Sequence, residues 1–217
     1  ELKNKALAYM FYEPSTRTRL SFESAMLRLG GRVIGTENAQ EFSSAVKGES
    51  LEDSIRVIGG YCDCIVLRHD EEGSAEKASR VSKVHIINAG DGKGQHPTQA
   101  LLDVYTIYRE FGKVDGLKIA MVGDLASGRT VRSLCYMLGK FIDIEIIFVS
   151  PSNLRMKEDI KKYLVERGVN FREENDLNKI LNIVDVVYMT RIQKERISLE
   201  EYEKAKGKFV IDERNLN

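Results

Sequence analysis

The chain has 217 residues, of which 42% are hydrophobic and 30% charged, and its 33 Lys and Arg balance 33 Asp and Glu. This composition is ordinary for a globular protein, and the length suffices for one large domain or two small ones. The zero formal net charge removes the electrostatic argument for a protein that binds nucleic acid or a membrane surface. No apolar run approaches the roughly 20 residues that span a bilayer.

The cysteines and histidines lack the spacing of a metal site or a redox centre. Cys62 and Cys64 are separated by a single residue, unlike a zinc knuckle or a CxxC pair, and Cys135 stands alone. The three histidines are not paired at metal-ligand spacing. We therefore expect no metal, no cofactor and reduced thiols, as in a cytoplasmic protein.

Short apolar or β-branched runs alternate with segments of helical period along the chain. Seven runs predict strands, at residues 6–11, 33–35, 64–67, 84–87, 118–122, 144–149 and 184–189. Apolar residues spaced three or four apart predict helices near residues 22–29, 51–58, 96–111 and 156–164. Ser198 and Glu201 have the spacing of a capping box, which marks a further helix start.

This order predicts an α/β protein, because strands that alternate with helices form parallel sheets covered on both faces. A single sheet would need seven or more strands in one layer. We therefore predict two doubly wound domains, each a parallel β-sheet flanked by helices. The long helix that ends near residue 111 is followed by a turn-rich break, so the domains are residues 1–111 and 112–217.

The first cluster with chemical potential lies where a strand runs into Pro14 and a helix begins. Ser15, Thr16 and Thr18 place three hydroxyls in the first helical turn, with Arg17 among them. A helix N-terminus presents unpaired backbone N–H groups and the positive end of the helix dipole. The pattern favours a phosphate-binding site over a plain helix cap with a surface arginine.

The second cluster is the glycine-rich stretch from residue 88 to residue 99, which follows another strand. Ligands bind at the carboxyl ends of strands in parallel sheets. His96 and Gln99 flank Pro97, so both side chains could reach one ligand, His96 at a carbonyl oxygen and Gln99 at an amide. The alternative for His96 is an ordinary loop histidine with satisfied hydrogen bonds.

The third cluster, residues 123–130, nearly matches the P-loop spacing, but Arg129 stands where lysine is required. A guanidinium is a planar fork suited to a carboxylate.

In the fourth cluster, Arg191 and Gln193 alternate across Ile192 just past a strand, so both point the same way in an extended segment. An arginine beside a glutamine suits a carboxylate, although a charge run is more often a solvated face.

Two smaller features complete the set. Arg68 follows a strand, and Ser43 and Lys47 lie in a long polar loop of a size that is often functional. Several strands of a parallel sheet thus end in arginine, histidine, glutamine or hydroxyl residues, without a nucleophile triad or a paired acid and base. Such a site binds oxyanions, and catalysis there would depend on positioning and electrostatic stabilisation.

The motifs at residues 13–19 (EPSTRTR) and 96–99 (HPTQ) resemble the transcarbamoylase family. Residues 43–49, 123–130 and 190–196 resemble its aspartate branch specifically. The ornithine branch would carry an Asp with a Ser-Met-Gly loop and a Cys near Cys-Leu-Pro, and neither occurs in this sequence.

The resemblance implies transfer of the carbamoyl group of carbamoyl phosphate to the amino group of L-aspartate, in pyrimidine synthesis. It implies that the first domain binds carbamoyl phosphate and the second binds aspartate. The residues carried over are Ser15, Thr16, Arg17 and Thr18 for the phosphate, Arg68, His96 and Gln99 for the carbamoyl group, and Arg129, Arg191 and Gln193 for aspartate. Arg17, Lys47, Arg68 and His96 are the implied catalytic set.

The resemblance also implies an assembly. Ser43 and Lys47 would enter the site of a neighbouring subunit in a homotrimer, and a regulatory chain is a further partner that the resemblance leaves open. Glu13 would bridge to Arg129 and Arg196 when the two domains close and expel water. The family has a further N-terminal helix and a C-terminal His-Pro-Leu-Pro-Arg segment, which this sequence does not contain. We therefore expect a protein limited to these residues to be inactive or poorly folded.

Three alternatives stay open at the level of sequence. The nearest is transfer of the carbamoyl group to ornithine. The second is a nucleotide-binding protein that uses residues 123–130 in the manner of a P-loop. The third is a non-catalytic relative that keeps the fold as a partner module.

Overall fold

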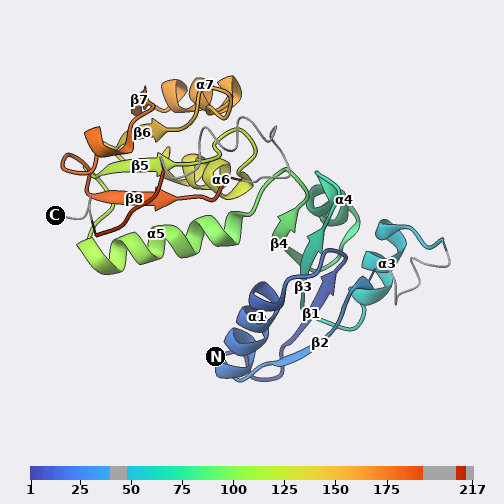
Figure 1. The fold of residues 1–217 in the computed structure, drawn as a ribbon. Helices are drawn as coiled ribbons and strands as arrows, with labels where there is room; N and C mark the ends of the chain where they lie inside the picture. Colours follow the sequence, from blue (N-terminus) through green and yellow to red (C-terminus); the bar gives the residue numbers. More distant parts are fainter. Residues whose placement is uncertain (40–47, 193–208, 214–217) are drawn as a thin grey trace. The chain divides into compact units, whose positions relative to one another are not determined.

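The computed structural model describes residues 1–39, 48–192 and 209–213. The chain divides into two compact units, Glu1–Thr98 and Gln99–Asn217. Each unit contains a four-stranded sheet in which all neighbouring strands are parallel (Figure 1). The predicted fold class, two α/β domains with parallel sheets flanked by helices, is therefore confirmed.

The first unit has the strand order β2-β1-β3-β4. Its strands are β1 (Ala6–Phe11), β2 (Arg32–Glu37), β3 (Cys64–His69) and β4 (His85–Asp91). Its helices are α1 (Thr16–Arg28), α3 (Leu51–Ile58) and α4 (Ser74–Val81). Side chains alternate between the two faces of a strand, so each face has its own core. One core joins Met10 and Leu67 to Ile55 of α3, and the other joins Phe11 and Val66 to Met26 of α1.

The second unit has the strand order β7-β6-β5-β8. Its strands are β5 (Lys118–Val122), β6 (Glu145–Val149), β7 (Asn170–Glu174) and β8 (Val186–Met189). Its helices are α5 (Pro97–Phe111), α6 (Arg129–Leu138) and α7 (Glu158–Glu166), with a short 3-10 turn at Leu177–Lys179. Met121 and Phe148 pack with α6 and α7 on one face, while Val122 and Val149 pack with Leu177 on the other.

Helix α5 belongs by its packing to the second unit. Ile107 is buried in the same core as Ile119 of β5, so the compact units divide between Thr98 and Gln99. The sequence pattern places the domain boundary at the end of this helix, at residue 111. Figure 1 shows α5 running alongside β8.

Within the part of the chain that the structure describes, each helix is too short or too polar to cross a membrane. All seven predicted strands are present, two of them, β1 and β5, with the predicted bounds. Strand β7 was not predicted. The predicted capping box at Ser198 lies outside the described residues.

Candidate functional site

The carboxyl ends of β1 and β3 bring Glu13 and Arg68 together in the first unit. Phe11 and Arg68 are register partners, and the Tyr12 N–H donates to the Arg68 carbonyl oxygen at 2.8 Å. The Arg68 side chain is buried, with Nη2 donating to Glu13 Oε1 at 2.9 Å and Nη1 donating to the Ala89 carbonyl oxygen at 3.1 Å. The guanidinium is thus held at a fixed place on this edge of the sheet.

The cluster that the sequence predicts to bind phosphate lies at the start of α1. Ser15 is the N-cap residue in an extended conformation, but its side chain makes no cap hydrogen bond. Its hydroxyl donates to Thr18 Oγ1 at 2.9 Å instead. The arrangement keeps the side chains of the first turn off the backbone N–H groups, which are the groups that bind an anion at a helix start. Thr16 and Arg17 are exposed.

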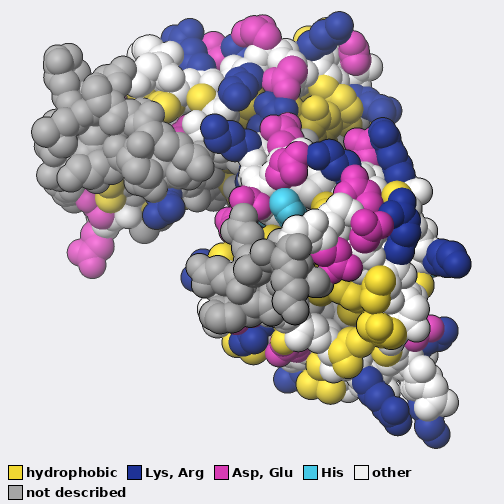
Figure 2. Space-filling model, turned by 90° about the vertical axis from the view of Figure 1, so that its right-hand side faces the viewer, with side chains coloured by type: hydrophobic (Ala, Val, Ile, Leu, Met, Phe, Trp, Pro, Cys, Tyr) yellow, Lys and Arg dark blue, Asp and Glu magenta, His cyan; other side chains and the backbone are white. Residues whose placement is uncertain are grey.

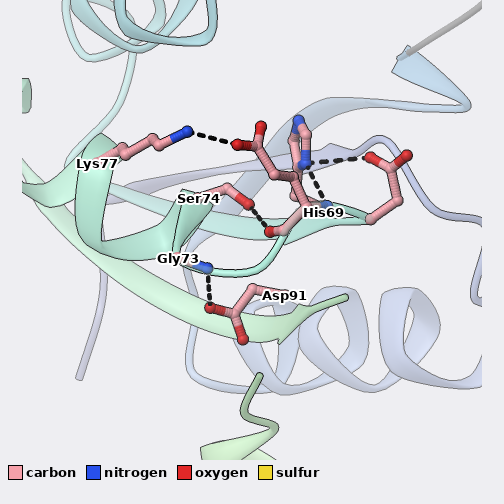
Figure 3. Close-up of polar contacts among 7 residues, drawn as sticks. His69, Gly73, Ser74, Lys77 and Asp91 are labelled. Carbon is pink, nitrogen blue, oxygen red and sulfur yellow. Dashed lines mark hydrogen bonds and ion pairs between the residues drawn. The ribbon is translucent and has the colours of Figure 1, made fainter. Parts of the chain in front are cut away.

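The loop after β4 is held by Asp91, a residue to which the sequence patterns assigned no role. Its buried carboxylate accepts from the Gln95 N–H at 2.7 Å and from the Gly73 N–H at 3.1 Å. Figure 3 shows this link between the end of β4 and the start of α4. The loop leads directly into His96, which is buried and has Nδ1 3.4 Å from Thr98 Oγ1. The Asp91 hydrogen bonds therefore fix the backbone directly before His96, the candidate catalytic histidine.

His69, next to Arg68, is a second residue without an assigned role. Its Nδ1 accepts from the Glu71 N–H at 3.0 Å, and its ring lies against Tyr12 with centroids 4.6 Å apart (Figure 3 shows the Nδ1 contact). Burial lowers the pKa of His69, although neighbouring carboxylates oppose the change. The ring contact ties the segment after β1, which carries Glu13, to the end of β3, which carries Arg68.

The lowered pKa predicts a pH dependence of stability. The unfolded chain binds a proton at His69 more tightly, so the stabilisation is complete above the unfolded pKa of about 6.5 and is lost as pH falls through the lower folded value. The free energy of unfolding should therefore fall between about pH 7 and pH 5. In His69→Asn the fall should be smaller, because an amide oxygen can accept from Glu71 without titrating.

Urea unfolding at a series of pH values measures this slope. The matched control is His85→Asn, which removes an exposed imidazole at the start of β4 and is expected to keep the wild-type slope. An unchanged slope in His69→Asn would contradict the role given to His69.

In the second unit, the carboxyl ends of β5 and β8 meet. The Thr190 N–H and hydroxyl both donate to the Val122 carbonyl oxygen, at 2.8 and 2.9 Å. Arg129 is the first residue of α6 after the loop that follows β5, and Arg191 directly follows Thr190. Arg129 is half-buried and Arg191 is exposed. Arg129 and Arg191 thus follow β5 and β8, two neighbouring strands, beyond their carboxyl ends.

Gly123 makes this close approach possible. It has φ of 114°, and an added Cβ would overlap the Thr190 carbonyl oxygen and lie 2.5 Å from Thr190 Oγ1.

We expect Gly123→Ala to lower the free energy of unfolding by about 3 kcal/mol, since it combines backbone strain with overlap. Gly168→Ala is the control, because Gly168 has φ of 69° but open space around it. Gly168→Ala should lower the free energy of unfolding by about 1 kcal/mol. Denaturant unfolding compares the two variants. Equal losses of stability would contradict the overlap at Gly123.

The side chain of Gln99, another predicted binding residue, has a half-buried partner in the second unit, Asp103. Its Nε2 donates to Asp103 Oδ1 at 2.8 Å, and the Tyr188 hydroxyl donates to Asp103 Oδ2 at 3.0 Å. Four other predicted site residues, Ser43, Lys47, Gln193 and Arg196, lie outside the described residues.

The first unit therefore assembles Glu13, the start of α1, Arg68 and the loop to His96 at one sheet edge, and the second unit assembles Arg129 and Arg191 at another. Among residues 1–39, 48–192 and 209–213, no group of three or more His, Cys, Asp or Glu side chains could hold a metal ion. Over the described part of the face in Figure 2, basic and acidic side chains are interspersed. Each edge offers donors and positive charge, so the arrangement can bind oxyanions.

Comparison with known proteins connects both halves of the chain to one family. Residues 1–109 match the model of the aspartate/ornithine carbamoyltransferase carbamoyl-P binding domain. Residues 115–217 match the model of the aspartate/ornithine carbamoyltransferase Asp/Orn binding domain. The two matched ranges account for nearly the whole sequence.

Individual relatives are similar over the same range. Aspartate carbamoyltransferase 3, chloroplastic, of Pisum sativum is 61% identical over 100% of this chain and 56% of its own length. The aspartate carbamoyltransferase catalytic subunit of Methanocaldococcus jannaschii is 58% identical over 97% of this chain and 69% of its own length. This chain thus spans a little over half the length of the plant relative.

Solved structures have the same fold. The catalytic subunit of M. jannaschii aspartate transcarbamoylase superposes with a TM-score of 0.92 at 56% identity, covering 100% of this chain and 71% of that one. The aspartate transcarbamoylase of Trypanosoma cruzi in complex with carbamoyl phosphate superposes with a TM-score of 0.90 at 39% identity, covering 99% of this chain and 69% of that one.

Proposed function

This chain belongs to the aspartate/ornithine carbamoyltransferase family, and we propose that it transfers the carbamoyl group of carbamoyl phosphate to the amino group of L-aspartate. The products are N-carbamoyl-L-aspartate and phosphate, in de novo pyrimidine biosynthesis. The observation that carries the proposal is the 61% identity, along the whole chain, to a relative named for aspartate. Arg129 and Arg191, which follow the neighbouring strands β5 and β8, support it, because two guanidinium groups suit a dicarboxylate.

The start of α1 binds the phosphate of carbamoyl phosphate in this proposal. Backbone N–H groups of the first turn, the hydroxyls of Ser15, Thr16 and Thr18, and the exposed Arg17 supply donors and positive charge. The helix dipole adds to the attraction, and the anion needs no metal ion to offset its charge.

Arg68 and His96 polarise the carbonyl of the carbamoyl group. As the amine attacks, negative charge develops on the carbonyl oxygen, and donors fixed in advance stabilise that charge most. The Glu13 carboxylate and the Ala89 carbonyl oxygen hold the Arg68 guanidinium in place, and Asp91 holds the loop before His96. The departing phosphate accepts the proton of the amine, so the site needs no dedicated general base.

Arg129, Arg191 and Gln193 bind aspartate in this proposal. A guanidinium forms two parallel hydrogen bonds with a carboxylate, so each arginine suits one carboxylate of the substrate. Ornithine carries a cationic amine in place of the second carboxylate, and two arginines at one edge disfavour it by like-charge repulsion.

Assembly and location extend the proposal. Ser43 and Lys47 enter a neighbouring site in a homotrimer, and Glu13 bridges to Arg129 and Arg196 on domain closure. The proposed partners include a regulatory chain. The proposed location is the cytoplasm, whereas the plant relatives are named chloroplastic.

Phosphate release tests the function. With carbamoyl phosphate present, release by the full chain should depend on aspartate and should not respond to ornithine. Release that depends on ornithine would show the other branch of the family, and release that needs neither amino acid would show hydrolysis. Binding of ATP that is lost in Arg129→Ala would instead support the P-loop alternative.

A further inference from the structure

Asp103 lies on α5 one turn beyond Gln99, at the spacing that places two side chains on one helix face. Its two carboxylate oxygens have different donors: Oδ1 accepts from Gln99 Nε2 at 2.8 Å, and Oδ2 accepts from the Tyr188 hydroxyl at 3.0 Å. Tyr188 comes from β8, two residues before Thr190 and the edge that carries Arg191. All three residues belong to the second unit.

The chemistry of Asp103 determines which end of the Gln99 amide faces it. An ionised carboxylate has acceptors and no donor, so it can pair with the –NH2 of Gln99 but not with its carbonyl oxygen. The orientation of a glutamine amide is normally inferred from its hydrogen-bond partners. Here the partner permits one orientation, in which Oε1 points away from Asp103 and is left to accept a hydrogen bond.

The surroundings shift the pKa values of Asp103 and Tyr188. Burial raises the pKa of Asp103, against the hydrogen bonds from Gln99 and Tyr188, which lower it. Burial, together with the Asp103 charge, raises the pKa of Tyr188 to about 12, against a hydrogen bond with Thr130 that lowers it. Tyr188 therefore remains a hydroxyl donor at neutral pH and occupies the second oxygen of Asp103.

We propose that Asp103 is a positioning residue that fixes the Gln99 amide, so that Gln99 presents its carbonyl oxygen to the N–H groups of the carbamoyl substrate. Tyr188 holds Asp103 in place for this purpose. The inference rests on the proposed function, because it concerns how the carbamoyl group is recognised. It predicts that the site selects an amino group over a methyl group on the carbonyl carbon of an acyl phosphate.

Asp103→Asn in the full chain tests the proposal. An asparagine can face Gln99 with its oxygen or with its –NH2, because the Tyr188 hydroxyl can either donate or accept, so Gln99 no longer has a fixed orientation and its –NH2 can face the substrate. We expect the KM for carbamoyl phosphate to rise about tenfold, as for the loss of one buried hydrogen bond. The inhibition constant of acetyl phosphate, which has a methyl group in place of the amino group, should stay within about twofold.

Tyr188→Phe is a second variant. It removes the donor to Oδ2 but leaves the Asp103 carboxylate, which can pair only with the –NH2 of Gln99. The KM for carbamoyl phosphate should therefore stay within about threefold of wild type. Asp185→Asn is the matched control, because Asp185 accepts from the Lys118 N–H at 2.7 Å at the amino end of the same sheet. Asp185→Asn should leave the KM for carbamoyl phosphate and the inhibition constant of acetyl phosphate unchanged.

The outcomes separate the two proposals. A wild-type chain that forms no N-carbamoyl-L-aspartate would overturn the proposed function. An active wild type in which Asp103→Asn changes carbamoyl phosphate and acetyl phosphate equally, or changes neither, would overturn the role of Asp103. If Asp103→Asn does not fold, the side-chain amide signals of Gln99 in ¹⁵N NMR of the wild-type protein decide. Slow exchange of these protons in wild type supports the hydrogen bond to Asp103, and solvent-like exchange contradicts it.

Discussion

Replacing Arg68 with alanine is expected to lower kcat for carbamoyl transfer by about a thousandfold, the upper range for removal of one donor to a developing oxyanion. The effect should fall mainly on kcat, because the contact strengthens as charge develops. The substitution also removes the ion pair with Glu13 and the hydrogen bond to the Ala89 carbonyl oxygen. The free energy of unfolding should therefore fall by about 3 kcal/mol.

Arg56→Ala is the matched control. Arg56 also forms an ion pair in the first unit, with Asp53 at 2.6 Å, but its side chain is 55% exposed. It should keep wild-type kcat and lose less than about 1 kcal/mol of stability. Steady-state kinetics and denaturant unfolding on the same samples compare the variants. A folded Arg68→Ala chain with kcat near wild type would contradict the role of Arg68.

Arg129→Ala is expected to reduce kcat/KM for aspartate by about a thousandfold, since it removes a charge-assisted contact to a substrate carboxylate. Binding of phosphate should be largely retained, because the residues proposed to bind phosphate lie in the other unit. Isothermal titration with inorganic phosphate and initial rates at varied aspartate concentration measure the two effects. Activity on aspartate that persists undiminished would show that Arg129 has another role.

Arg132→Ala on the same helix separates binding from folding. Arg132 pairs with Asp159 of α7 through two hydrogen bonds, at 2.6 and 3.1 Å. Its loss should lower the stability of the second unit while leaving kcat/KM for aspartate near the wild-type value. A comparable loss of kcat/KM in both variants would indicate that Arg129 acts through the structure of α6.

Most strands could be predicted because strands of a covered parallel sheet are nearly continuous apolar runs. Strand β7 was missed for the opposite reason. It lies at the edge of its sheet, and its sequence is rich in charge, with Arg172, Glu173 and Glu174 among five residues. Helix α4 gave little signal either, because its buried positions include Ala75 and Ala78 rather than large apolar residues.

The candidate site was predictable where residues gather at strand ends, as at Arg68 and Arg129. Its supporting residues were not, because their partners lie far away in the sequence. Asp91 accepts from Gly73, 18 residues earlier, and Tyr188 donates to Asp103 across 85 residues. A lone aspartate in a glycine-rich loop or on a helix has no pattern that reveals such a partner. These contacts require the tertiary structure.

The most direct measurement of the central claim follows the carbamoyl carbon itself. A protein that contains this sequence at the full length of its relatives is incubated with ¹³C-labelled carbamoyl phosphate and equal amounts of aspartate and ornithine, and the reaction is followed by ¹³C NMR. Transfer to aspartate predicts that the label appears in N-carbamoyl-L-aspartate. Label in the ureido group of the ornithine product, or in hydrolysis products alone, would contradict the account.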